Sequence, residues 1–174
     1  MPDVVTGRVW KFGDNINTDL MVPGFTLRFS AKDQLKYLFS ANRPGWIDEV
    51  QVGDVLIGGK NFGTGSSRPG ARSIYNAGIR ALVTDGLNGL FLRNSVNFGL
   101  PAMQAPGVSE IFEEGDIAEI NFSEGTVRNQ RTGAVVRGTP LPRMLMDIVD
   151  AGGIEELLRK EGYLPPLEAA AAGS

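Results

Sequence analysis

The chain contains neither cysteine nor histidine. These two residue types make disulfides, thiolate nucleophiles, imidazole bases, most zinc sites and the ligand sets of iron–sulfur clusters. Any chemistry in this chain must therefore rest on Ser, Tyr, Lys, Arg and carboxylates, or on a metal centre borrowed from a partner. The lack of cysteine also suits a reducing compartment, so we expect a cytoplasmic protein.

A strong excess of charge and long apolar runs are missing as well. The chain has 17 Lys and Arg against 20 Asp and Glu, a net charge of -3, which creates no field that attracts nucleic acid. The apolar runs fall far short of the roughly 20 residues needed to span a bilayer, and no charged-then-apolar leader opens the chain. We therefore expect neither a nucleic-acid partner nor a membrane partner.

The length and apolar content suit one globular domain. The chain has 174 residues, of which 42% are hydrophobic, enough to bury an ordinary core. We predict a single domain over residues 1–164. Pro165-Pro166 leads into an alanine run, which predicts a flexible C-terminal tail over residues 165–174.

Hydrophobic periodicity and turn residues divide the chain into alternating strands and helices, followed by short strands. Strands are predicted at residues 4–12, 54–58, 81–84 and 100–104, with helices at 31–40, from near Pro69 and at 88–97. Three short strands at 117–122, 126–129 and 134–137 are separated by hairpin turns, and a helix pair at 144–150 and 154–161 surrounds Gly152-Gly153. The pattern predicts an α/β fold in which a small antiparallel β layer follows the β/α units.

The segment from Gly59 to Arg68 is the strongest candidate for a binding site. It follows a short apolar strand, contains Gly63 and Gly65, and leads into a helix that begins near Pro69. Glycine lets a ligand approach the backbone closely, and a helix N-terminus presents unpaired N–H groups with partial positive charge. This combination predicts a site for a carboxylate or a phosphate.

Neither of the two common nucleotide-binding loops fits this segment. The dinucleotide fingerprint needs a third glycine where Arg68 stands, and the P-loop needs Lys followed by Ser or Thr where Ser66-Ser67 stand. A plain strand-to-helix turn capped by serines fits the same residues. Spacing alone therefore leaves both the anion site and the structural turn open.

Residues 61–68, Asn-Phe-Gly-Thr-Gly-Ser-Ser-Arg, resemble the Asn-Phe-Gly-x-Gly-Ser-Ser-Arg signature of the swivelling domain in the aconitase superfamily. The resemblance covers most of the chain. Residues 7–19, followed by Pro23-Gly24, are similar to the start of the separately encoded small subunits of that family, and residues 91–94 through 99–101 match a third segment. The resemblance implies a swivelling β/β/α domain with a central mixed sheet flanked by helices.

The resemblance also implies a hydro-lyase subunit, which removes water from a hydroxy-di- or tricarboxylate and adds it back, as in the leucine-pathway isomerisation of 3-isopropylmalate. In this family a [4Fe-4S] cluster on the larger domain or subunit binds the substrate hydroxyl and carboxylate. A chain without cysteine is then active only with a cluster-bearing large subunit and binds no metal through its own side chains. Homoaconitate, aconitate and 2,3-dimethylmalate are alternative substrates, and a non-catalytic small-anion-binding module is the alternative function.

The resemblance assigns roles to individual side chains. Ser66 takes the proton from the carbon next to a substrate carboxylate, and Ser67 and Arg68 bind that carboxylate, since a guanidinium can donate two parallel hydrogen bonds. Asp19 matches a family carboxylate that approaches the active centre. Arg28 falls in the loop that senses the variable end of the substrate, where a positive charge suits a distal carboxylate and the flanking phenylalanines leave an apolar group open.

The chain departs from the family pattern directly after the motif. Many relatives follow the arginine with Glu and then His or Ser before an alanine, whereas this chain has Pro69-Gly70-Ala71. The departure alters the helix start beside Arg68. It favours a substrate different from that of the leucine-pathway enzyme, or the non-catalytic module.

Overall fold

The strands form one mixed sheet in the computed structural model, which describes residues 4–65 and 68–167. Within these residues the sheet has seven strands in the order β4-β3-β2-β1-β5-β6-β7. The strands are β1 (Val4–Lys11), β2 (Val55–Gly58), β3 (Ala81–Thr84), β4 (Ala102–Gln104), β5 (Ile117–Asn121), β6 (Thr126–Asn129) and β7 (Val135–Arg137). Most of the predicted C-terminal tail lies outside the described residues, because only residues 165–167 of it belong to them.

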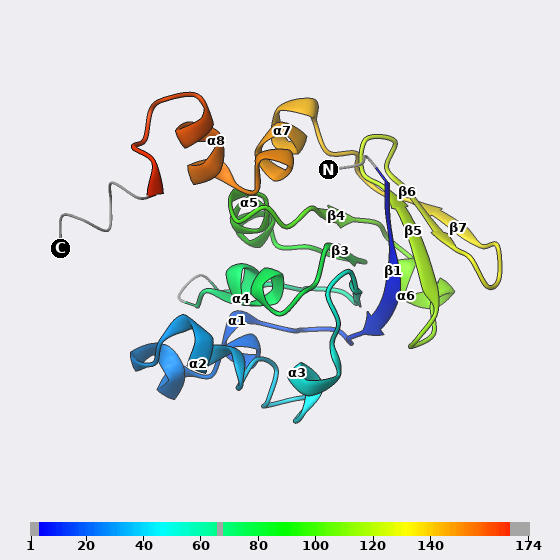
Figure 1. Ribbon diagram of the computed structural model, residues 1–174. Helices are drawn as coiled ribbons and strands as arrows, with labels where there is room; N and C mark the ends of the chain where they lie inside the picture. The colour runs from blue at the N-terminus through cyan, green and yellow to red at the C-terminus, as the bar shows by residue number, and fades with distance from the viewer. Residues whose placement is uncertain (1–3, 66–67, 168–174) are drawn as a thin grey trace.

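Strand β1 joins the parallel and antiparallel halves of the sheet. Its residues 9–11 pair in parallel with β2, and its residues 4–8 pair antiparallel with β5. Beyond these pairs, β2, β3 and β4 continue in parallel and β5, β6 and β7 antiparallel. The predicted antiparallel strands are therefore present, but they extend one curled sheet (Figure 1), because the 8-residue β1 is long enough to serve both halves.

Helices cover both faces of the sheet, as the family resemblance predicts (Figure 1). Helices α4 and α5 lie against one face and α6 against the other. The helices are α1 (Thr18–Met21), the 3-10 helix η1 (Gly24–Arg28), α2 (Ala31–Leu35), α3 (Trp46–Glu49), α4 (Gly70–Asn76), α5 (Gly89–Asn97), α6 (Val108–Ile111), α7 (Arg143–Ala151) and α8 (Ile154–Lys160). In the described part of the chain, no helix has the length and apolar character needed to cross a membrane.

Alternate side chains of the central strands belong to two hydrophobic clusters, one on each face of the sheet. Leu56 of β2 and Leu82 of β3 pack with residues of α4 and α5 on one face. Ile57 and Val83 pack with Val108 of α6 on the other. A parallel strand covered on both faces needs apolar side chains at every position, so these strands read as continuous apolar runs without alternation.

Most of the predicted elements agree with the structure, and residues 31–40 are the main exception. Helix α2 ends at Leu35, and the chain then turns so that the buried Phe39 ring packs against Trp46. Phe39 has a φ of +57°, and its N–H donates to the carbonyl of Met21. A residue in the left-handed region cannot continue a right-handed helix. Helices α1, η1, α3 and α6 were not predicted, since such short elements show no periodicity.

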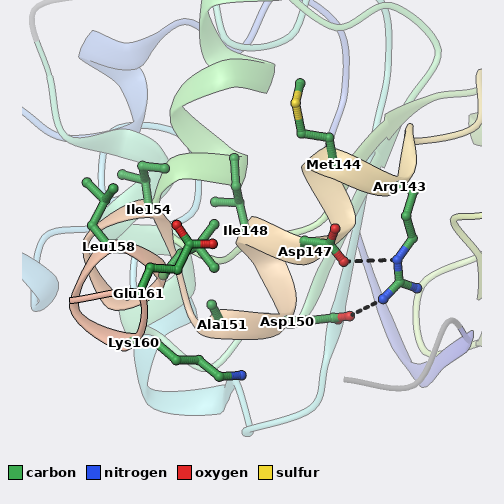
Figure 2. Close-up of a pocket in the computed structure, with 11 residues that line it drawn as sticks. Arg143, Met144, Asp147, Ile148, Asp150, Ala151, Ile154, Leu158, Lys160 and Glu161 are labelled. Atoms are coloured by element: carbon green, nitrogen blue, oxygen red, sulfur yellow. Dashed lines mark ion pairs between the residues drawn. The ribbon is translucent and has the colours of Figure 1, made fainter. Parts of the chain in front are cut away.

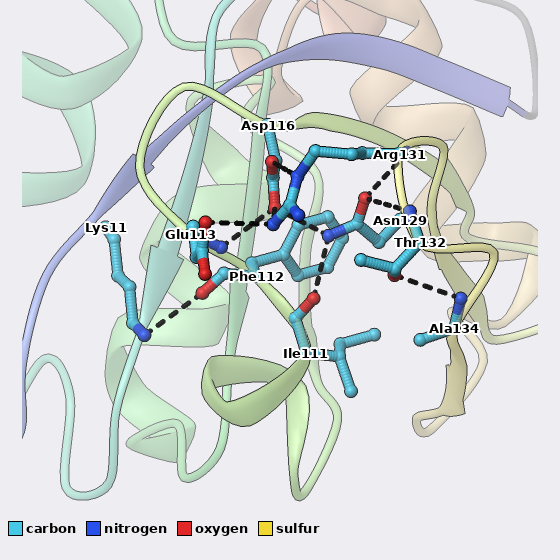
Figure 3. A network of polar contacts seen from close by, with 9 residues as sticks. All are labelled: Lys11, Ile111, Phe112, Glu113, Asp116, Asn129, Arg131, Thr132 and Ala134. Carbon is cyan, nitrogen blue, oxygen red and sulfur yellow. Dashed lines mark hydrogen bonds and ion pairs between the residues drawn. The ribbon is translucent and has the colours of Figure 1, made fainter.

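A buried carboxylate joins the antiparallel hairpin to the turn that follows α6 (Figure 3). Asp116 accepts hydrogen bonds from the Glu113 N–H at 2.9 Å, from Asn129 Nδ2 at 2.6 Å, and from Arg131 Nε and Nη2 at 2.6 and 3.1 Å. The charged hydrogen bond from Arg131 holds the pKa of Asp116 well below its usual range, despite the desolvation that opposes it. This network ties the turn between β6 and β7 to the segment that precedes β5.

Candidate functional site

The motif loop after β2 is held by backbone hydrogen bonds on both sides. On one side, the Gly63 N–H donates to Ile16 O at 2.7 Å, and the Thr18 N–H donates to Thr64 O at 2.8 Å. On the other, the Phe62 N–H donates to Gly86 O at 2.8 Å. Residues 13–18 and 85–88 thus extend the parallel order of the sheet into the loop region. Residues 62–64 of the motif are therefore held in place by the surrounding fold.

Two glycines and one phenylalanine of the motif explain how the loop turns. Gly63 and Gly65 have φ values of +79° and +89°, the left-handed backbone predicted for them. Phe62 is fully buried, and its ring meets that of Phe91 edge-on at 5.9 Å between centroids. A Cβ added at Gly65 would lie 2.6 Å from the hydroxyl oxygen of buried Thr18. The loop is thus anchored by an aromatic contact and packed closely on the segment before α1.

Asp19 and Arg68, both predicted site residues, form an ion pair. The distance from Arg68 Nε to Asp19 Oδ1 is 2.9 Å, and the two side chains are 22% and 67% exposed. Asp19 lies in α1, whose N-cap Asn17 accepts a hydrogen bond from the Leu20 N–H. The contact is one of charge, because within the described residues Arg68 Nε is buried without a hydrogen-bond partner. The terminal nitrogens of a guanidinium carry four further N–H donors, which suit binding to an anion. The structure therefore brings a carboxylate and a guanidinium together from segments far apart in the sequence.

The Pro69-Gly70 departure has a packing reason. Helix α4 begins at Gly70 after Pro69, close to the predicted start, and the Ser73 N–H donates to Pro69 O at 2.9 Å. A Cβ on Gly70 would lie 2.7 Å from the sulfur of Met21 and 3.2 Å from the Phe91 ring. Larger side chains do not fit there without movement of the core. The departure is therefore compatible with a formed Arg68–Asp19 ion pair.

Arg28 lies apart from this ion pair, at the far end of η1. Its guanidinium lies 5.8 Å from the centroid of the Phe29 ring, and within the described residues it has no ion-pair partner. Gly24, the first residue of η1, lies against Arg68. Four steps along a 3-10 helix, at about 2.0 Å per residue, place Arg28 roughly 8 Å from Gly24. Its side chain borders a hollow of about 440 Å³ that Phe29 and Tyr37 also line. The prediction that Arg28 binds substrate is untested by this geometry.

The motif serines, Ser66 and Ser67, lie outside the described residues, so their predicted roles stay predictions. Sequence reasoning missed a residue that lies against Arg68. A Cβ on Gly24 would lie 3.0 Å from Arg68 Nη2. Pro23-Gly24 was part of the family match, but nothing in the local pattern of residues signals that Gly24 faces the motif arginine.

A larger hollow, of about 810 Å³, lies between α7 and α8 and contains none of the predicted site residues (Figure 2). The one arginine in its lining, Arg143, is already paired with Asp147 at 2.9 Å and with Asp150 at 3.8 Å. Its other lining side chains include the apolar Ile148, Ile154 and Leu158. The motif loop remains the better candidate for anion binding.

The chain offers no ligand set for an iron–sulfur cluster. It has no cysteine, the residue that ligates nearly all such clusters. Among the described residues, no group of three or more His, Cys, Asp or Glu side chains could hold a metal ion. The residues of this chain therefore do not fit a cluster of their own.

Comparison with known proteins identifies the family of the chain. Residues 32–107 match the Aconitase C-terminal domain family. The chain is 43% identical to 3-isopropylmalate dehydratase small subunit 1 of Methanopyrus kandleri, over 93% of this chain and 96% of that protein. It is 38% identical to the isopropylmalate/citramalate isomerase small subunit of Methanocaldococcus jannaschii, over 92% and 97%.

A solved structure agrees over nearly the whole chain. The crystal structure of 3-isopropylmalate dehydratase from Methanocaldococcus jannaschii superimposes with a TM-score of 0.82 at 28% identity, covering 98% of this chain and 99% of that one. Sequence and structure therefore place the chain in the aconitase family, among its separately encoded small subunits of the 3-isopropylmalate dehydratase type.

Proposed function

We propose that this chain is the small subunit of a hydro-lyase that dehydrates and rehydrates a hydroxy-dicarboxylate of the 3-isopropylmalate class. Relatives named 3-isopropylmalate dehydratase small subunit support the proposal, because their similarity covers almost the full length of the chain. The observation that carries it is the Arg68–Asp19 ion pair, which presents a guanidinium beside the end of a rigidly held glycine loop. An arginine oriented in this way suits a carboxylate substrate.

In this proposal the chain supplies an acid–base group and a carboxylate clamp. Ser66 takes the proton from the carbon next to a substrate carboxylate, while the substrate hydroxyl leaves from the neighbouring carbon. A free serine is a weak base, so its oxygen needs hydrogen-bond donors from the loop backbone or a nearby cation. Ser67 and the terminal nitrogens of Arg68 bind the carboxylate, and the negative charge of Asp19 keeps the Arg68 guanidinium near it.

The iron–sulfur cluster of the family then belongs to a separate large subunit, because this chain has no cysteine to ligate it. The chain by itself is inactive, and its site is half of an active site. The large subunit and a small hydroxy-carboxylate are the two partners that the proposal requires.

Arg28 and its aromatic neighbours are proposed to meet the variable end of the substrate. The guanidinium suits a distal carboxylate, as in homoaconitate or aconitate. Phe25, Phe29 and Tyr37 pack together with ring centroids 5.1–6.1 Å apart, and such a surface suits an alkyl group. Because both features are present, comparing activity on several substrates is the measurement that decides which group binds at the variable end.

The test is reconstitution of the purified chain with its cluster-bearing large subunit. Hydratase activity is expected only in the mixture, first on 3-isopropylmalate and then on citramalate, 2,3-dimethylmalate, homoaconitate and aconitate. Ser66→Ala should lower kcat by at least roughly 100-fold, the usual contribution of a general base. Arg68→Lys should lower kcat/KM roughly 10- to 100-fold, because it removes a charge-assisted hydrogen bond.

The matched control is Arg72→Lys. Arg72 is an exposed arginine in α4 whose guanidinium lies over the Phe98 ring, so its replacement should leave the kinetics unchanged. Full activity of Ser66→Ala would remove the serine from the mechanism. Tight dicarboxylate binding by the isolated chain, without activity in the mixture, would favour the non-catalytic anion-binding module.

A further inference from the structure

Gly24 lies against the guanidinium of Arg68. A Cβ built on Gly24 would be 3.0 Å from Nη2 and 3.6 Å from Cζ of that side chain. The first distance is shorter than an ordinary van der Waals contact between carbon and nitrogen, so a methyl group there requires the guanidinium to move by a few tenths of an ångström. Gly24 and Asp19 thus bound the guanidinium of Arg68 on two edges.

The backbone does not require glycine at position 24. Gly24 opens η1 and is not among the glycines with a φ in the left-handed region. Its Cβ position meets only Arg68 among the described residues. The guanidinium of Arg68 is therefore the group that a side chain at position 24 would displace.

The position of the guanidinium matters for carboxylate binding. A bidentate arginine–carboxylate pair needs two parallel N–H···O bonds of about 2.7–2.9 Å, and a shift at one terminal nitrogen breaks that match. Asp19 lies 2.9 Å from Nε, so a displacement imposed at Nη2 shifts the guanidinium relative to that carboxylate as well as to the substrate.

We propose that Gly24 is a positioning residue, which leaves the space that Arg68 needs to present both terminal nitrogens to the substrate carboxylate. This inference rests on the proposed function of Arg68. It adds that the first residue of η1, the helix that ends in Arg28, sets the geometry of the clamp.

The proposal predicts a separation of activity from stability. Alanine is compatible with the backbone at position 24, and a Gly→Ala change at such a site restricts the unfolded chain and does not weaken the folded one. Gly24→Ala in the assembled enzyme should therefore raise KM roughly 3- to 10-fold, with a smaller change in kcat, because a sub-ångström misplacement costs part of the roughly 100-fold loss of a full ångström. The melting temperature should stay equal or rise.

The matched control is Gly89→Ala. Gly89 also has an ordinary backbone, it lies in the first turn of α5, and a Cβ there meets no atom within 4 Å. Its substitution should give the same small stabilisation with KM and kcat unchanged. Calorimetric titration of the assembled enzyme with 3-isopropylmalate gives an independent measure of binding.

A double-mutant cycle shows whether Gly24 acts through Arg68. Gly24→Ala should add little in an Arg68→Lys background, because the fork that it displaces is already gone. The inference is overturned by wild-type kinetics in Gly24→Ala, by an equal loss in both backgrounds, or by a loss that a lower melting temperature accompanies. Absence of hydratase activity in the wild-type mixture would instead overturn the proposed function.

Discussion

Replacing the buried carboxylate of Asp116 with an amide should destabilise the fold more than any exposed charge change nearby. Asp116 is 6% exposed and receives four hydrogen bonds, two of them from the Arg131 guanidinium. In Asp116→Asn, an amide NH2 group replaces one carboxylate oxygen. This group cannot accept the hydrogen bonds that the surrounding N–H donors make to that oxygen. Removal of one partner from a fully buried ion pair costs about 3–5 kcal/mol. Arg131 is 52% exposed and can turn to water, so the expected loss is about 2–3 kcal/mol.

The same substitution should remove a pH dependence of stability. The pKa of Asp116 is lower in the folded chain, so its contribution is fully present above the unfolded value of about 3.9 and is lost as the pH falls through the folded value. The difference in unfolding free energy between wild type and Asp116→Asn should therefore be constant from pH 7 to about pH 5 and should shrink below about pH 4. Urea unfolding at a series of pH values measures it.

Glu113→Gln is the matched control. Glu113 pairs with the same Arg131 at 3.0 Å, but its side chain is 78% exposed, so its loss should cost less than about 1 kcal/mol. At about 2–4 °C per kcal/mol for a chain of this size, Asp116→Asn should lower the melting temperature by about 5–10 °C and the control by at most a few degrees. Equal destabilisation by the two variants, or a difference that grows below pH 4, would refute this account.

Three further substitutions probe the site and its anchor. Phe62→Ala should cost about 3–5 kcal/mol, because it empties a fully buried aromatic position, and urea unfolding should show that loss with cooperativity retained. Asp19→Asn should lower kcat/KM roughly 10-fold while moving the melting temperature by less than about 3 °C, since the Asp19 side chain is 67% exposed; wild-type kinetics in the reconstituted enzyme would contradict its role in positioning Arg68. Arg28→Ala should lower kcat/KM for homoaconitate more than for 3-isopropylmalate, and an equal change for both substrates would exclude Arg28 from selecting the variable end.

Local sequence patterns predicted the elements that bury a full face. The strand at residues 81–84 and the helix at 88–97 agree with β3 and α5 because their apolar spacing and the Asn88 cap are local signals. The predicted helix at 31–40 was too long, because its end depends on Phe39, which turns back to bond Met21. A contact between segments so far apart leaves no mark on the periodicity of either one.

The sequence by itself determined the chemistry that is available. The lack of cysteine and histidine excludes thiolate, imidazole and cysteine-ligated iron–sulfur chemistry from this chain's own side chains, and the motif at residues 61–68 identifies the family. The tertiary structure decided how the pieces meet: β1 serves both halves of one sheet, Asp19 reaches the motif arginine, and Gly24 leaves room for that arginine's terminal nitrogens. The reason is physical. Residue type and spacing carry information about contacts within a few positions along the chain, whereas the placement of Arg68 depends on segments that meet only in the folded tertiary structure.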